Sequence, residues 1–92
     1  MFENTSFECT NLSSWQAYLP TEIGEKIALR FKGRPMKVDG KSYYKKQWYF
    51  VDSERNLFHV YKTVSGSTRY NLAGYDIPND QVVAFVDWVK SI

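Results

Sequence analysis

Basic and aromatic side chains gather in the middle of this 92-residue chain, in types that bind anions and flat rings. Residues 26–46 contain eight Lys and Arg against one Asp, a net charge of +7, whereas residues 1–25 contain four Glu and no base. Aromatic residues make up 17% of the chain and include seven Tyr and three Trp. Cations contact phosphates and flat rings stack on unpaired bases, so this combination predicts a surface for nucleic acid or another polyanion.

Catalytic and metal-binding chemistry has little support in the sequence. The chain has one His and one Cys, too few for a Cys/His zinc site. His59 is the only candidate general base, and its expected neighbours include no carboxylate and no nucleophile. Cys9 has no basic neighbour that would activate its thiol. No GxSxG, Walker or GxGxxG motif is present. We therefore predict a non-enzymatic protein with no catalytic residue, no metal site and no cofactor.

The expected setting of the protein is the cytoplasm. The chain contains no apolar run of about 18 residues, so we expect no membrane-spanning helix and no membrane partner. Its first ten residues lack the basic and apolar regions of a signal peptide. A lone Cys gives no intramolecular disulfide, which is typical of a reducing compartment.

Hydropathy patterns predict strands in the middle of the chain and a helix at its end. Apolar and polar residues alternate over 26–32, which predicts a half-buried strand. Asp39-Gly40 is a strong hairpin signal, so a second strand is expected over 41–51. Further strands are expected at 57–63 and near 68–72. From residue 79 the apolar positions follow helical spacing, a stripe made of Val82, Phe85, Val86 and Val89.

These elements predict an α+β domain over residues 1–92. Its sheet would be a four-stranded antiparallel meander over 26–72, with a C-terminal helix over 78–91 packed on one face. The acidic segment 1–25 would hold a short helix that has Leu12, Trp15 and Leu19 on one side and ends at Pro20.

Turn chemistry predicts which residues share a face of that sheet. A two-residue turn at Asp39-Gly40 places Leu29 opposite Phe50 and Phe31 opposite Trp48. On the next strand Phe50 would pair with Phe58, Trp48 with Val60, Tyr49 with His59 and Gln47 with Tyr61. A three-residue loop over 64–66 would then pair Val60 with Tyr70 and Phe58 with Leu72, with Arg69 beside Tyr61 and Asn71 beside His59.

The opposite face would be an exposed basic and aromatic surface, and it is the predicted binding site. Arg34 would lie opposite Lys45, and two like charges facing each other favour an anion between them. The alternatives are a solvated face of good strand formers and a face covered by the N-terminal segment with Phe2 and Phe7. The candidate binding residues are Arg30, Lys32, Arg34, Tyr43, Lys45, Tyr49, His59, Tyr61 and Arg69.

Three functions compete on these grounds. The first is a binding module for nucleic acid or a nucleoprotein complex. The second is a protein-binding inhibitor or adaptor, of the kind that phage and mobile-element proteins use against host enzymes or defence complexes. The third is capture of a small anionic ligand between Arg34 and Lys45. The sequence leaves the oligomeric state and the choice among DNA, RNA and an acidic protein surface open.

Residues 68–92 combine a final strand, Tyr75, Pro78 and a helix that returns to the sheet. This plan resembles that of AP2-type domains and integrase arm-binding domains, and the resemblance implies a sheet-plus-helix architecture. No binding residue of those families has a clear match upstream, so none is transferred.

Overall fold

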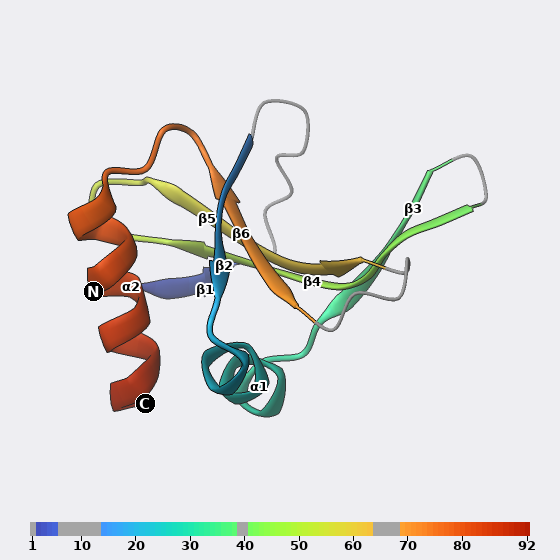
Figure 1. Ribbon diagram of the computed structural model, residues 1–92, viewed down its shortest axis with the longest axis horizontal. Helices are drawn as coiled ribbons and strands as arrows, with labels where there is room; N and C mark the ends of the chain where they lie inside the picture. The colour runs from blue at the N-terminus through green and yellow to red at the C-terminus, as the bar shows by residue number, and fades with distance from the viewer. Residues whose placement is uncertain (1, 6–13, 39–40, 64–68) are drawn as a thin grey trace.

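The structure is a computed structural model that describes residues 2–5, 14–38, 41–63 and 69–92, with backbone alone for residues 14, 34–38, 41–45 and 63. It contains six strands and two helices (Figure 1). The elements are β1 (Glu3–Thr5), β2 (Ser14–Leu19), α1 (Thr21–Arg30), β3 (Arg34–Val38), β4 (Lys41–Val51), β5 (Leu57–Thr63), β6 (Tyr70–Gly74) and α2 (Asn79–Ser91). The predicted α+β class is confirmed. Neither described helix is long and apolar enough to cross a membrane.

All pairings in the sheet are antiparallel, and the strand order is β1-β4-β5-β6-β2. Strand β4 is 11 residues long and has two partners along the same edge. Its second half pairs with β1, and its first half pairs with β3. The sheet therefore has two strands more than the predicted meander, and both β1 and β2 come from the segment expected to lie outside it.

The predicted strand over 26–32 is wrong, because residues 26–30 belong to helix α1 and residues 31–32 to the connection after it. The alternation of Ile27, Leu29 and Phe31 coincides with a helical stripe in which Ile23 and Ile27 are one turn apart and buried. Leu29 faces water and is 87% exposed, so it does not pair with Phe50. Helix formers dominate the segment and Pro20 precedes it, where a proline is tolerated.

The predicted helix before Pro20 is also wrong, since residues 14–19 form strand β2 on the edge beside β6. Trp15 and Tyr18 are good strand formers, and Leu19 reaches the core opposite Tyr70. The place of Leu12 lies outside the described residues. A register shift between Trp15 and Ala17 marks a β-bulge in this strand.

The register between β4 and β5 is the predicted one, with Trp48 opposite Val60 and Phe50 opposite Phe58. The register between β5 and β6 is shifted by two residues, so Val60 faces Leu72 and not Tyr70. A shift of two leaves every side chain on its expected face, because side chains alternate with a period of two.

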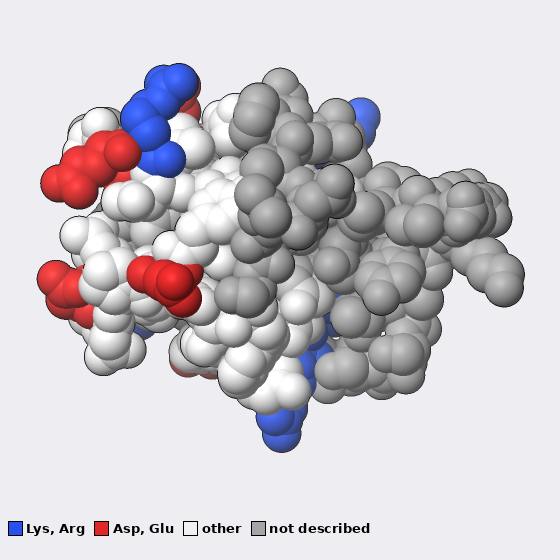
Figure 2. Space-filling model, turned by 90° about the horizontal axis from the view of Figure 1, so that it is seen from above, with Lys and Arg blue, Asp and Glu red and all other residues white. Residues whose placement is uncertain are grey.

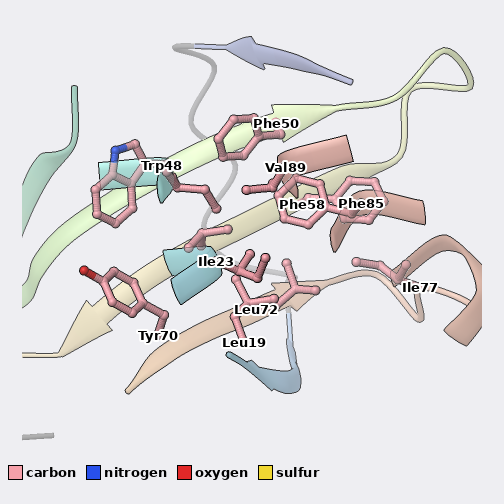
Figure 3. Close-up of a cluster of buried hydrophobic side chains, with 12 residues drawn as sticks. Leu19, Ile23, Trp48, Phe50, Phe58, Tyr70, Leu72, Ile77, Phe85 and Val89 are labelled. Carbon is pink, nitrogen blue, oxygen red and sulfur yellow. The ribbon is translucent and has the colours of Figure 1, made fainter. Parts of the chain in front are cut away.

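The core lies between the sheet and both helices (Figure 3). Phe58 and Phe85 stack at its centre, with ring centroids 5.0 Å apart and planes 13° apart. Phe85 and Val89 of the predicted stripe are fully buried, and Val82 and Val86 pack against them. The helix predicted over 78–91 is therefore confirmed as Asn79–Ser91, on the expected face of the sheet.

Candidate nucleic-acid interface

The middle of the opposite sheet face is buried, which corrects the predicted binding surface. Tyr49 and His59 are each only 2% exposed, and Gln47 and Asn71 are buried beside them. Alternation along a strand shows which residues share a face, but not whether water reaches that face. The prediction that Tyr49 and His59 form an exposed binding surface is wrong for this reason.

These buried residues form a polar cluster that is held by its own contacts. The rings of Tyr49 and His59 stack with centroids 4.5 Å apart and planes 3° apart. Gln47 Oε1 accepts a hydrogen bond from the Tyr49 hydroxyl at 2.9 Å and lies 2.9 Å from His59 Nε2. An amide oxygen can only accept, so Nε2 carries the ring proton. Burial lowers the pKa of His59 from 6.5 to about 4, which makes it a neutral structural residue at neutral pH.

The remaining predicted binding residues lie in several different elements. Arg30 is exposed in the last turn of α1 and not on the sheet, and Lys32 is exposed in the connection that follows. Tyr61 is half-buried on β5. Arg69 is exposed just before β6, and its guanidinium carbon lies 4.7 Å from the ring centre of Tyr18. The residue opposite Tyr61 on β6 is Asn71.

Arg34, Tyr43 and Lys45 are described by their backbone, which lies in the β3–β4 hairpin. The expected turn register holds at its tip, where Val38 faces Lys41, and shifts at two irregularities further down. Arg34 consequently faces Gln47 and not Lys45. The like-charge pair predicted for Arg34 and Lys45 is wrong, and with it the reason for placing a small anion between them.

Phe2 belongs to the core and does not cover the polar face. Its ring makes edge contacts with Phe58 and Phe85, at centroid distances of 5.1 and 5.3 Å. The N-terminal segment therefore contributes to the helix side of the sheet through this residue. The position of Phe7 lies outside the described residues.

A different like-charge pair is present at the base of the hairpin. Lys46 and Lys62 are directly opposite each other on β4 and β5, and neither is buried. Their register positions place them on the helix side of the sheet, the side of Trp48 and Tyr70. The Lys62 ammonium lies 4.9 Å from the ring centre of Tyr70, a contact that offsets part of the repulsion.

A run of basic residues extends from the end of α1, through the β3–β4 hairpin, to Lys46 of the Lys46–Lys62 pair. We call residues 30–46 the basic arm, because they contain seven Lys and Arg against one Asp, a net charge of +6. The arm joins the body where the Trp48 indole N–H donates a hydrogen bond of 2.9 Å to the Phe31 carbonyl. A Cβ on Gly33 would come within 2.8 Å of the Trp48 ring, so a glycine permits this close approach.

Charge is therefore separated along the molecule. In Figure 1 strand β3 and the adjoining half of β4 lie at the opposite end from α2. The α2 end, residues 52–56 and 75–92, contains five acids and two bases. Acidic side chains gather at that end in Figure 2. Such a distribution makes the electrostatic potential differ in sign between the two ends.

The described residues contain no group of three or more His, Cys, Asp and Glu side chains that could hold a metal ion. No protein-family model, no curated protein and no solved structure matches the chain. The function is therefore argued from the geometry and charge of the chain itself.

Proposed function

We propose that this protein is a binding module for nucleic acid and that the basic arm is its contact surface. The observation that carries the proposal is the Lys46–Lys62 pair at the base of the arm. Opposed cations with Cβ atoms about 5 Å apart destabilise a sheet unless an anion lies near them. A phosphate backbone supplies such anions at regular spacing along the arm.

The test is binding of a labelled oligonucleotide, measured by fluorescence anisotropy at several salt concentrations. The variant Lys46→Glu removes one cation and places opposite charges across the two strands. We expect weaker binding and a salt slope smaller by about one, because a phosphate contact is lost. The matched control is Lys90→Glu, which makes the same charge change in the last turn of α2, away from the arm.

Stability separates loss of binding from loss of fold in this experiment. Lys46→Glu should leave the free energy of unfolding unchanged or raise it by up to about 1 kcal/mol, since it replaces repulsion by attraction. Weak binding by the wild-type protein at low salt contradicts the proposal, as does equal binding by Lys46→Glu and Lys90→Glu.

A protein partner is the second candidate, and the exposure of Leu29 favours it. This side chain is 87% exposed on α1, next to Arg30 at the beginning of the basic arm. An inhibitor or adaptor would use this apolar residue together with the neighbouring cations against an acidic protein surface. A partner retained after nuclease treatment and lost in Leu29→Ser would support this function over the first.

A further inference from the structure

A second group of exposed side chains lies at the β2 edge of the sheet, apart from the basic arm. Trp15 is 51% exposed and Tyr18 is 52% exposed, and their ring centroids are 5.1 Å apart. The guanidinium of exposed Arg69 lies over the Tyr18 ring. We call Trp15, Tyr18 and Arg69 the aromatic patch.

The β-bulge in β2 creates this patch. Residues three apart in a regular strand point to opposite faces. The bulge adds one residue, so Trp15 faces Ala73 and Tyr18 faces Asn71, two positions on the same side of β6. The extra residue, Gln16, accepts a hydrogen bond of 2.8 Å from the Ile77 N–H through its side-chain oxygen. That bond holds the bulge against the connection that leads into α2.

We propose that the aromatic patch stacks unpaired bases, so that the nucleic acid bound by this protein is single-stranded. The inference rests on the proposed function and adds the class of ligand. Half-exposed Trp and Tyr offer ring surface to bases, and Arg adds a cation for phosphate or for stacking. Strand β2, which carries Trp15 and Tyr18, and its partner β6 contain no carboxylate, so these two strands do not repel a polyanion.

The position of the patch relative to the lysine pair also favours a single strand. Arg69 precedes Tyr70, and the Tyr70 ring contacts Lys62, which faces Lys46. Three strand spacings, about 14 Å, separate β4 from β2, the strand of Trp15 and Tyr18. The aromatic patch lies on the polar face of the sheet, however, and the lysine pair lies on the helix side. One backbone that contacts both must bend around the sheet, which a single strand does easily and a stiff duplex does not.

The experiment compares a labelled oligothymidine single strand with a hairpin duplex of similar charge, by anisotropy at one salt concentration. We expect the single strand to bind more tightly to the wild-type protein. The double variant Trp15→Ala, Tyr18→Ala should lose between roughly fivefold and a hundredfold in affinity for the single strand for each base that stacks. Its affinity for the duplex should not change. Val83→Ala, at an equally exposed apolar residue of α2, serves as the control and should change neither affinity.

A measurement on the wild-type protein does not depend on the folding of the variant. Trp15 is 51% exposed, whereas Trp48 is 2% exposed and Trp88 is partly buried against the core, so Trp15 is the tryptophan most open to a base. Stacking predicts that oligothymidine quenches tryptophan fluorescence and that Trp15→Phe removes most of the quenching.

Equal affinity for single strand and duplex overturns the inference, and so does single-strand binding without quenching. If Lys46→Glu still weakens binding in those cases, the proposed function stands without this extension. Absence of binding to either nucleic acid refutes both.

Discussion

The buried His59 should make this protein lose stability in mild acid, beginning at a pH above the range in which carboxylates titrate. His59 is neutral in the folded state, stacked on Tyr49 and bonded to Gln47 through Nε2. A second proton would have to enter at Nδ1, which is buried. Burial therefore lowers the pKa of this group from 6.5 to about 4, whereas the unfolded chain keeps the ordinary value.

The sign and the size of the effect follow from linkage. Between pH 6.5 and pH 4 the unfolded chain binds a proton at His59 that the folded protein does not bind. Stability is thus unaffected by this group above pH 6.5 and falls as the pH decreases through that interval. At about 1.4 kcal/mol for each pH unit, the loss reaches roughly 2 kcal/mol at pH 5 and roughly 3 kcal/mol near pH 4.

Urea unfolding followed by far-ultraviolet circular dichroism, at pH 7.5 and pH 5.0, measures this loss. The comparison variant is His59→Phe, which keeps a ring against Tyr49 and does not titrate. Gln47 still accepts the Tyr49 hydroxyl in this variant. We expect the wild-type protein to lose about 2 kcal/mol more than the variant between the two pH values. An equal loss in both proteins would show that His59 is protonated in the folded state and would refute the reasoning.

Three further predictions concern the core and one loop. Gly24→Ala should destabilise the protein by about 1–3 kcal/mol, because the added methyl group would overlap the Tyr70 ring, although alanine favours helices. Thermal unfolding tests this, with Leu29→Ala as the control at an exposed position of α1. Phe85→Ala should lose about 3–5 kcal/mol, since Phe85 is fully buried, and a urea midpoint close to that of the wild-type protein would contradict the core packing. Asp52→Ala should lose about 1–2 kcal/mol at pH 7, because its carboxylate accepts hydrogen bonds from the Asn56 side chain and from two backbone N–H groups in the β4–β5 loop. Burial raises the pKa of Asp52, but these bonds outweigh burial and lower it below 3.8, so this contribution should persist at pH 5 and disappear only in stronger acid.

The parts of the fold that the sequence predicts correctly are those determined by local pattern. Strands β4 and β5 and helix α2 have long, unambiguous periods, and large apolar residues fix the pairing of Phe50 with Phe58. The segment around Ile27 fails because its short alternation also satisfies a helical stripe that begins at Ile23. The helical stripe becomes evident only when the pattern is taken from Pro20 onwards.

The candidate site was less predictable, because burial depends on tertiary contacts. Nothing in the pattern of β4 and β5 distinguishes an exposed Tyr49 from one that is 2% exposed. The lysine pair was recoverable, since the predicted register already implied that Lys46 faces Lys62. The aromatic patch could not be predicted from the sequence, because a single-residue bulge in β2 brings Trp15 and Tyr18 to the same side.

The separation of charge between the basic arm and the α2 end gives the molecule an electric dipole along its length. A polyanion would exert a torque on that dipole before any contact forms and would turn the arm towards itself. The association rate should therefore fall steeply as ionic strength rises, while dissociation, which depends on contacts already made, should respond less. The fold would therefore orient the protein before contact, because it places the basic and acidic residues at opposite ends.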